Sequence, residues 1–319
     1  MTPYQSALNP TGSQAAQLAH LFWIFTVVCT VAYVLVLVFF FGAVARSRRN
    51  AMADVSDERE ASHHRTVSAA AAVSIIGLLA LLVVSISVGA SVGTFGRGRA
   101  DQMEVEVTGH QWWWEVKYPD ALSPYQQIVD ANEIHIPVHT PVLLRLDTRD
   151  VIHSLWIPNL HGKRDLIPGR VNKFWIEADK PGVYRGQCAE FCGYQHAKMA
   201  FFVVAEPMDA FQTWLQHQRT EAIEPTTAEQ MRGRDTMESN PCVVCHTIRG
   251  TNLGSHVGPD LTHVGSRRSI AAATLPNSDG SLESWIDDSQ AIKPGNRMPA
   301  HMLSANQRRD VVAYLRSLQ

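Results

Sequence analysis

The stretch CAEFCGYQHAKM, residues 188–199, decides how the central part of this 319-residue chain is organised. It places two thiols, an imidazole and a thioether within twelve residues, at Cys188, Cys192, His196 and Met199. A blue-copper site with one metal ion uses one cysteine, two histidines and a weak axial methionine. The second cysteine in this stretch therefore makes two coppers bridged by two thiolates possible.

A copper pair needs an imidazole for each metal ion, and the stretch supplies only His196. His153, which lies 35 residues before Cys188 in the strand-like stretch DVIHSLW, is the best candidate for the second imidazole. Two alternatives stay open at this point. A Cys188–Cys192 disulfide would be geometrically awkward across three residues, and it would explain neither Met199 nor the separate histidine. A zinc ion could use the same two cysteines and two histidines.

The residues before this stretch have the pattern of β-strands. Apolar Met103, Val105 and Val107 alternate with polar residues, which is the period of a half-buried strand. Further short runs of strand-forming residues are separated by Pro-Gly pairs, and they lie at 142–146, 174–176 and 201–204. We therefore expect an all-β antiparallel sandwich over residues 97–217. At least one member of the run 112–114, Trp-Trp-Trp, is expected in its core, because neighbours on a strand face opposite sides.

Two uncharged apolar runs, residues 21–45 and 67–95, precede the sandwich, and each exceeds the about 20 residues that cross a bilayer. A cleaved signal peptide fits the first run poorly, because no Lys or Arg precedes Arg46. The sequence predicts two transmembrane helices within residues 1–96. Cys29 lies in the first run, where a free thiol behaves as a small buried hydrophobic group.

Arginines predict the orientation of these helices. The connecting segment 46–66 contains five of them, whereas residues 1–20 contain no Lys or Arg, and only Arg97 and Arg99 follow the second helix closely. By the positive-inside rule the connecting segment is cytoplasmic. We therefore expect a two-pass protein of the bacterial inner membrane, with both termini and the remaining domains on the periplasmic side. Disulfides, copper sites and covalent haem are all permitted there.

The carboxy-terminal part has a helical pattern. Residues 218–227 contain Glu221, Glu224 and Pro225 without apolar periodicity, which is typical of a linker. Beyond the linker, the segment 304–318 places Val311, Val312 and Leu315 on one helical face. We expect a separate all-α domain over residues 228–319.

The motif Cys242-Val-Val-Cys245-His246 in this domain is the attachment pattern of a c-type haem. Two thiols add to the haem vinyl groups, and the adjacent imidazole is turned onto the iron. A redox disulfide would be expected in a βαβ context, and a zinc site would need a second pair of ligands. Neither feature is present in the sequence, so His246 favours haem.

The sixth iron ligand is expected to be a methionine or a histidine further along the chain. The candidates are His256, His263, Met298, His301 and Met302. The segment Lys293-Pro-Gly-Asn-Arg-Met298-Pro resembles the axial-methionine loop of class I cytochromes c, and Gly258-Pro-Asp-Leu resembles their loop on the proximal side. We therefore predict Met298 as the ligand, with Met302 as its main rival.

Residues 101–217 resemble the CuA domain of cytochrome c oxidase subunit II. The two preceding helices, the cysteine stretch and three motifs carry the resemblance: QWWW at 111–114, VIHS at 151–154 and DLIPGR at 165–170. The resemblance implies a cupredoxin fold in which Cys188 and Cys192 bridge both coppers. It also implies that His153 and His196 each bind one copper, and that Met199 and the main-chain carbonyl of Glu190 are weak axial ligands.

Further roles follow from the same resemblance. The Glu190 side chain would reach a magnesium ion at the interface with the catalytic subunit, with Asp165 near that region. Trp112 matches the tryptophan that receives electrons from cytochrome c in this family. One departure is that many members begin the second helix with a Glu followed by Trp-Thr, where this chain has His63-His64-Arg65-Thr66. Glu60 is out of register, so no residue is assigned to proton uptake.

The whole chain resembles subunit II of a caa-type haem-copper oxidase, with a class I cytochrome c fused to its end. The resemblance implies an electron relay from an external donor, such as a cytochrome c or a quinol–cytochrome c reductase complex, to haem c, to CuA, and to the catalytic subunit I, alongside further oxidase subunits. That subunit reduces dioxygen to water and pumps protons.

The charge balance fits a protein partner of this kind. Residues 101–217 carry 10 Lys and Arg against 15 Asp and Glu, a balance that would attract a basic protein and repel nucleic acid. The alternative functions are a membrane-anchored copper-delivery or redox-sensing protein, and a structural subunit with degenerate sites. Every expected ligand is present, which argues against degeneracy. Nitrous oxide reductase shares the copper motif but needs a large propeller that 319 residues cannot include.

Overall fold

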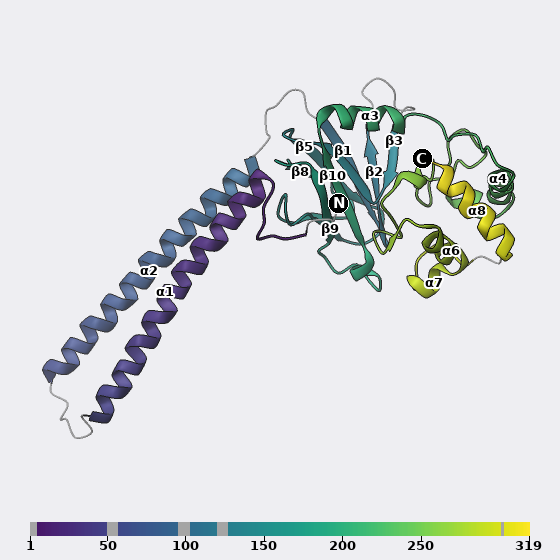
Figure 1. Cartoon of the computed structure of the whole chain (residues 1–319). Helices are drawn as coiled ribbons and strands as arrows, with labels where there is room; N and C mark the ends of the chain where they lie inside the picture. Colours follow the sequence, from purple (N-terminus) through teal and green to yellow (C-terminus); the bar gives the residue numbers. More distant parts are fainter. Residues whose placement is uncertain (1–4, 50–56, 95–102, 120–126, 301–302) are drawn as a thin grey trace. The chain divides into compact units, whose positions relative to one another are not determined.

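A computed structural model describes most of the chain, namely residues 5–49, 57–94, 103–119, 127–300 and 303–319 (Figure 1). The described residues belong to two compact units. One unit lies within residues 16–95, and the other combines residues up to 15 with those from 96 onward. Arg97, Arg99, His301 and Met302, which the sequence singled out, lie outside the described residues.

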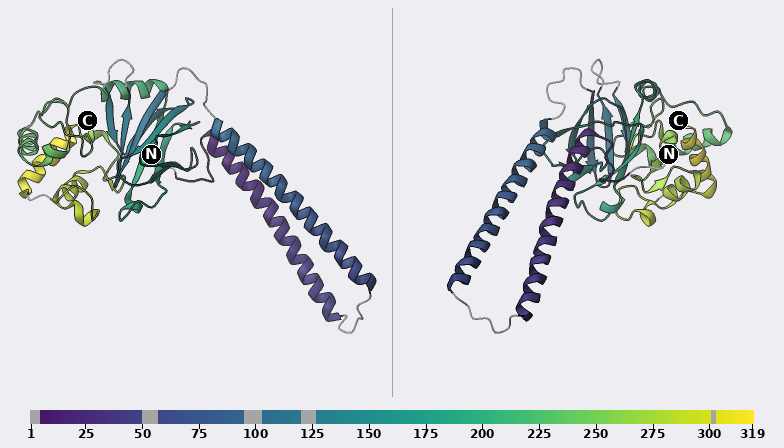
Figure 2. Two further views of the ribbon diagram at one scale, coloured as in Figure 1. Left: turned by 180° about the vertical axis from the view of Figure 1, so that it is seen from behind. Right: turned by 60° about the vertical axis from the view of Figure 1, so that its left-hand side comes forward.

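The first unit is a pair of long helices, α1 (Ser13–Arg49) and α2 (Asp57–Thr94), which run antiparallel (Figures 1 and 2). The segments Ser13–Arg48 and Glu60–Gly93 are long and apolar enough to cross a membrane, with 18-residue windows that reach mean hydropathies of 2.8 and 2.7. Most of the large apolar side chains between Phe22 and Phe41 and between Val67 and Ile86 are exposed. A surface of this kind is stable against lipid, not against water. These helices coincide with the two apolar runs predicted to be transmembrane.

The second unit contains a sandwich of two five-stranded sheets. The first sheet has the order β3-β2-β1-β5-β8 and consists of β1 (Met103–His110), β2 (Trp113–Tyr118), β3 (Ile128–Ala131), β5 (Val142–Thr148) and β8 (Asn172–Ile176). The second has the order β4-β10-β9-β6-β7 and consists of β4 (Glu133–Pro137), β6 (His153–Trp156), β7 (Arg164–Leu166), β9 (Gly182–Cys188) and β10 (Ala200–Glu206). The strands predicted from alternation and from the apolar runs are all present, and the predicted β-sandwich is confirmed.

The prediction of a purely antiparallel sandwich is wrong, because each sheet contains one parallel pair. Strand β1 pairs with β5 in parallel, with Met103 opposite Val142, and β10 pairs with β4 in parallel. Between β1 and β5 the chain leaves the first sheet to form β4 in the second sheet. A chain that crosses to the other layer and returns can bring its strand back in the same direction, which a tight hairpin cannot do.

The core between the sheets is formed by inward-facing residues of both layers, including Val105, Val107 and Trp114. Trp114 is fully buried, so one member of the tryptophan run is a core residue, as predicted. Cys188, Cys192 and Met199 belong to the same buried cluster. The cysteine stretch is therefore embedded in the core and is not a surface loop.

The remaining elements are mostly short and helical. They are η2 (His196–Lys198), α3 (Met208–Gln218), α4 (Ala228–Ser239), α5 (Cys242–Cys245), η3 (Val264–Ser266), β11 (Ser269–Ile270), β12 (Leu275–Pro276), α6 (Asp279–Asp287), α7 (Ser289–Ile292) and α8 (Ala305–Ser317). Thr227 and Ser304 are the N-cap residues of α4 and α8. Each forms a capping box that satisfies the first backbone N–H groups of its helix. These two helices cross closely at Gly233, where a Cβ atom would lie 2.1 Å from the Asp310 carbonyl oxygen. They enclose a second core that includes Tyr314.

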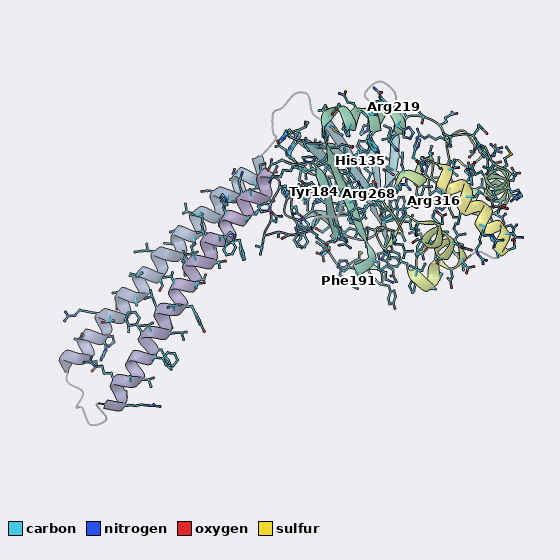
Figure 3. All side chains as sticks on the ribbon, in the orientation of Figure 1. His135, Tyr184, Phe191, Arg219, Arg268 and Arg316 are labelled. Atoms are coloured by element: carbon cyan, nitrogen blue, oxygen red, sulfur yellow. The ribbon has the colours of Figure 1, made fainter. Side chains whose placement is uncertain are left out.

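A buried polar cluster lies where β4, β10 and α3 meet. The His135 imidazole, labelled in Figure 3, lies 2.9 Å from the Glu206 carboxylate and 3.8 Å from that of Glu133. It stacks on the Trp214 ring with a centroid distance of 4.0 Å. Burial lowers the pKa of His135, but the two carboxylates outweigh this effect and raise the pKa to about 8.

The raised pKa of His135 predicts that the stability of the sandwich depends on pH. Because the pKa exceeds its ordinary value of 6.5, the stabilisation is fully present below pH 6.5 and is lost as the pH rises through about 8. His135→Gln should lower the free energy of unfolding by on the order of 2 kcal/mol at the acidic end of this range, and by much less at the alkaline end. Urea unfolding of residues 97–319, followed by tryptophan fluorescence, measures the free energy of unfolding at each pH. The exposed residue His139 provides the control variant, His139→Asn. A destabilisation that is the same at every pH contradicts it.

Candidate functional site

The β9–β10 hairpin shapes the cysteine stretch. Cys188 is the last residue of β9, and its backbone N–H donates to the Met199 carbonyl at 2.9 Å. The next amide, of Ala189, donates to the Ser154 carbonyl of β6 at 2.9 Å. The hydrogen bond to Met199 thus closes the loop between β9 and β10, and the hydrogen bond to Ser154 attaches this loop to β6. Its residues are brought together by the sheet ladder, which places Cys188 and Met199 side by side.

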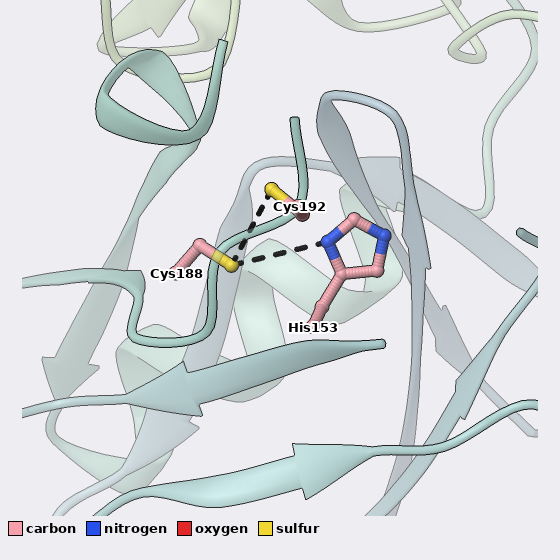
Figure 4. A group of neighbouring side chains, drawn as sticks. All are labelled: His153, Cys188 and Cys192. Carbon is pink, nitrogen blue, oxygen red and sulfur yellow. Dashed lines mark hydrogen bonds between the residues drawn. The ribbon is translucent and has the colours of Figure 1, made fainter. Parts of the chain in front are cut away.

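Two thiols lie at the centre of the site, with the His153 imidazole beside Cys188 (Figure 4) and the His196 imidazole beside Cys192. The Cys188 and Cys192 Sγ atoms are 3.8 Å apart. His153 Nδ1 lies 3.9 Å from the Cys188 sulfur, and His196 Nδ1 lies 3.7 Å from the Cys192 sulfur. Both cysteines are free thiols, so the disulfide reading does not describe this structure. The two thiol–imidazole pairs are arranged nearly symmetrically.

Each of the two remaining predicted ligands lies beside a different thiol. The Met199 Sδ atom lies 3.8 Å from the Cys192 sulfur, and the Glu190 carbonyl oxygen lies 3.2 Å from the Cys188 sulfur. His153 and Met199 are at most 1% exposed. A dry site that combines thiolates, imidazoles and a thioether has the donor set of copper, because oxygen-preferring ions such as Mg²⁺ disfavour soft sulfur. The residues present fit a pair of copper ions.

Asp150 orients the His153 ring, a role that the sequence reasoning missed. Its Oδ1 atom lies 2.8 Å from His153 Nε2, which directs Nδ1 toward the sulfurs. Its Oδ2 atom accepts the backbone N–H of Gln111 at 2.7 Å. Burial raises the pKa of Asp150, but these hydrogen bonds prevail and lower the pKa to about 2. The aspartate three residues before the histidine was visible in the sequence, although its contact depends on the turn between them.

The two thiols differ in acidity. The hydrogen bond from Cys192 lowers the pKa of Cys188 against the opposing effect of burial, and His153 lowers it further. The same contact and burial raise the pKa of Cys192. Two thiolates so close together in a dry site repel each other, so the second ionises only when positive charge arrives. Metal binding at this site therefore releases protons.

The three consecutive tryptophans lie in different surroundings. Trp112 is 8% exposed, and its indole N–H donates to the Cys192 carbonyl at 2.8 Å. The Gln111 side-chain amide donates to the same oxygen at 2.8 Å. Trp113 stacks on His110 with ring centroids 4.4 Å apart, whereas Trp114 belongs to the core. Trp112 is thus the member that touches the cysteine stretch.

The Glu190 side chain points away from the thiols. It is 44% exposed, and its carboxylate lies 3.9 Å from the Lys163 ammonium. An exposed pair at this distance is weak and can be rearranged at little cost. Asp165 lies in the adjacent strand β7, and the exposed Phe191 projects from the same loop (Figure 3). The loop therefore presents the Glu190 carboxylate and the apolar Phe191 side chain at the surface, and β7 provides the carboxylate of Asp165.

The haem-attachment motif forms one helical turn. Cys242 and Cys245 begin and end α5, so their side chains share a face, and His246 follows in extended conformation. His246 Nδ1 lies 2.8 Å from the Pro259 carbonyl, which can only accept. The proton is therefore on Nδ1, and Nε2 carries the lone pair that an iron ligand needs. Gly258 leaves the room for this ring, since a Cβ there would lie 2.9 Å from His246 Cε1.

A cavity of about 1310 Å³, including its open mouth, adjoins this motif. Its wall contains Cys242, His246 and Met298 together with apolar residues such as Leu282 and Leu315. The chemistry of this wall fits a haem, and Cys242, His246 and Met298 are the residues in it that could hold one. Trp112 and Trp113 of the sandwich also line it, together with Lys293 of the haem domain, so both parts of the chain contribute to the same cavity.

The histidine candidates for the sixth ligand have other surroundings. Both ring nitrogens of buried His263 contact main-chain carbonyls, those of Gln319 at 2.9 Å and Thr220 at 3.2 Å. His256 is exposed and lies 3.4 Å from the Thr247 hydroxyl. Neither belongs to the wall of the cavity. Met298 does, whereas the rival Met302 lies outside the described residues.

Comparisons with known proteins assign a family to each of the two parts of the chain that carry these residues. The family described as cytochrome c oxidase subunit II, periplasmic domain, matches residues 103–206, and the cytochrome c family matches residues 230–319. Cytochrome c oxidase subunit 2 of Alkalihalophilus pseudofirmus is 35% identical over an alignment that covers 98% of this chain and 91% of that protein. The chain belongs to the cytochrome c oxidase subunit II family.

Other members of the family are more distant. Cytochrome c oxidase subunit 2 of Bacillus subtilis is 27% identical, with 99% of this chain and 92% of that protein covered. The crystal structure of the periplasmic domain of subunit II from Bradyrhizobium japonicum is 29% identical over 38% of this chain and 96% of that one, with a TM-score of 0.35.

The family settles the broad function of this chain. It is a membrane-anchored oxidoreductase subunit of a haem-copper oxidase complex, and its subunit II domain is followed by a cytochrome c domain. The two domains imply a copper centre and a haem c. The copper-delivery and redox-sensing alternatives are thereby set aside.

The contact between Asp150 and His153 predicts a loss of copper affinity when the carboxylate is removed. Asp150→Ala should weaken copper binding by about 10–100-fold, because the imidazole loses the group that fixes its orientation. Copper affinity is measured by competition with a chelator of known strength. Asp179→Ala, an exposed aspartate of the same domain, serves as the control. Equal affinities of the two variants would contradict the role of Asp150.

The space left by Gly258 predicts that a single methyl group disturbs the haem. Gly258→Ala should displace the His246 ring, because its Cβ would lie within 2.9 Å of the imidazole. We expect covalent haem to persist, with a visible spectrum that shows weakened imidazole ligation. Gly254→Ala is the matched control, since no heavy atom lies within 4 Å of its added Cβ. An unchanged spectrum in Gly258→Ala would refute this expectation.

Proposed function

We propose that this chain is the electron-input subunit of its oxidase, with a dinuclear CuA centre in residues 97–217, a linker at 218–227 and a covalent haem c in residues 228–319. The observation that carries the proposal is the pair of thiols 3.8 Å apart with one imidazole beside each. When bound, the two groups supply one-electron chemistry that leads from a donor to the catalytic subunit, where dioxygen is reduced.

In this proposal Cys188 and Cys192 would hold both coppers, and His153 and His196 would each hold one. Met199 and the Glu190 carbonyl would be weaker ligands. The burial of Cys188, Cys192, His153 and Met199 supports a permanent site, because a delivery protein must release its metal through an accessible face. The three rigid attachments of the loop, to β6, β10 and Trp112, keep the ligand positions fixed when the charge of the centre changes.

At the haem, Cys242 and Cys245 form the thioether bonds, and His246 and Met298 bind the iron. Local contacts support the role of Met298. Its carbonyl accepts the Ser289 hydroxyl at 2.6 Å and the Gln290 amide at 2.7 Å, while its N–H donates to the Asn296 side chain at 2.8 Å. A methionine loop held by three hydrogen bonds keeps the thioether in place, and methionine raises the haem potential.

We further assign the two redox domains to the periplasmic side, on the basis of the arginines between the helices. The acidic balance of residues 101–217 supports a basic protein donor, such as a cytochrome c. Trp112 is proposed as the group that receives electrons for the copper centre, because its indole N–H contacts the Cys192 carbonyl. A magnesium ion at the Glu190 side chain, shared with the catalytic subunit, completes the assignment.

Metal analysis tests this proposal directly. The soluble fragment of residues 97–319 is expected to contain two coppers and one covalent haem, and electron paramagnetic resonance should show one unpaired electron shared by both coppers. A single localised copper, or zinc alone, would contradict the two-copper centre. Met298→Ala should abolish the methionine signature in the haem spectrum, with Met302→Ala as its control. Loss of that signature only in the Met302 variant would overturn the assignment.

A further inference from the structure

Lys293 occupies an unusual position between the sandwich and the haem domain. It follows α7 and begins the loop that leads to Met298, and it is 2% exposed. Lysine is among the residues least often buried, because its ammonium group loses strong hydration. Among the ion pairs of the described residues, none includes Lys293. Burying this ammonium group costs free energy, so its burial indicates a specific role for Lys293.

The ammonium group is held by two main-chain carbonyls from different parts of the chain. Lys293 Nζ donates to the Trp112 carbonyl at 2.7 Å and to the Ala271 carbonyl at 3.1 Å. Burial, followed by the nearby charge of Lys198, lowers the pKa of Lys293 to about 7. The first of these bonds crosses from the haem domain to the sandwich, over a sequence separation of 181 residues.

Trp112 continues this link to the copper ligands. Its carbonyl accepts the Lys293 ammonium, and its indole N–H donates to the Cys192 carbonyl at 2.8 Å. The loop from Lys293 to Met298 passes close to the same ring, since a Cβ on Gly295 would lie 3.7 Å from the Trp112 ring. A continuous series of contacts thus joins the loop of the proposed iron ligand to a proposed bridging cysteine.

Other contacts hold the same boundary without involving Trp112. The buried ion pair of Arg267 with Asp130 has a distance of 2.8 Å, and the Gln195 amide donates to the Pro294 carbonyl at 2.7 Å. The backbone of Ala200 donates to the Ala272 carbonyl at 3.2 Å. These contacts should keep the two domains together when Lys293 is changed. The specific effect of Lys293 is then on the position of Trp112 relative to the methionine loop.

We propose that Lys293 is a positioning residue for electron transfer between the haem and copper domains, fixing the Trp112 main chain to the loop that carries Met298. The proposal rests on the proposed function of the two sites. One electron leaves the haem and one arrives at the copper pair, while Lys293 forms and breaks no covalent bond. Its contribution is to keep Trp112, and the copper loop attached to it, at one distance from the haem.

The test uses the full chain in its oxidase complex, with Lys293→Met as the main variant. Methionine retains the apolar stem and removes the donors, so the hydrogen bonds to the Trp112 and Ala271 carbonyls are both lost, and only the first of them joins the two domains. Loss of one such bond is expected to reduce the population of the positioned arrangement about tenfold. The rate of electron transfer from haem to copper, measured by transient absorbance after photoreduction of the haem, should fall by a similar factor.

Lys198→Met is the matched control, because exposed Lys198 donates to the Ile292 carbonyl at the same boundary but does not reach Trp112. Its transfer rate should stay within about twofold of the wild-type rate, as for other exposed charged contacts. A merely structural role of Lys293 predicts a lower unfolding temperature with an unchanged rate in the folded fraction. That result, with intact haem and copper spectra, would overturn the proposal.

A second readout does not depend on electron transfer. Hydrogen exchange of the backbone amides in residues 109–114 should be faster in Lys293→Met than in Lys198→Met, even if the Lys293 variant binds its cofactors incompletely. Equal exchange in the two variants would also overturn the proposal. Failure of the proposed function itself would be recognised separately, in the wild-type chain, by the absence of the two-copper signal or of methionine ligation.

Discussion

The copper site depends on one constraint, that two thiols are held 3.8 Å apart inside a dry core. If both were ionised without metal, their charges would repel strongly in surroundings of low dielectric constant. The hydrogen bond with Cys188, burial and this repulsion, in that order, raise the pKa of Cys192. The sandwich holds the thiols in place nevertheless, because β6, β9 and β10 attach the loop through backbone hydrogen bonds. Only bound cations relieve the repulsion, so the fold provides an arrangement that favours metal.

The cytochrome c domain differs from the sandwich, because the haem proposed for it is larger than a copper pair and would be attached covalently. The residues proposed to hold it lie in loops and short helices around an apolar cavity, outside the paired strands. Hydrogen bonds to side chains and carbonyls position these residues instead. The Pro259 carbonyl sets the His246 tautomer. The side chains of Asn296, Ser289 and Gln290 hold the backbone of Met298. Gly258 also contributes to the position of His246, because the absence of a side chain there leaves the space for the imidazole.

Local patterns predicted the parts of these sites that are close in sequence. The C-x-x-C-H motif and the cysteine stretch each lie within one turn or one hairpin, so their spacing alone indicates shared geometry. His153 could be proposed only because a second imidazole was needed, and its place beside Cys188 follows from the pairing of β6 with β9. The parallel pairs, the role of Asp150 and the contact of Lys293 with Trp112 could not be predicted, because each depends on how the chain crosses between layers or domains.

The boundary between the two domains determines what the fusion of two redox modules achieves. A flexible linker raises the effective concentration of a tethered domain to roughly the millimolar range, but it leaves the orientation undetermined. Here a buried ion pair of Arg267 with Asp130 and several carbonyl contacts add a fixed orientation. Buried polar contacts suit this purpose, since a misplaced partner would leave charges such as that of Asp130 without compensation. In the proposed relay, the fusion would provide proximity through the linker and geometry through the boundary, and electron transfer would depend on both.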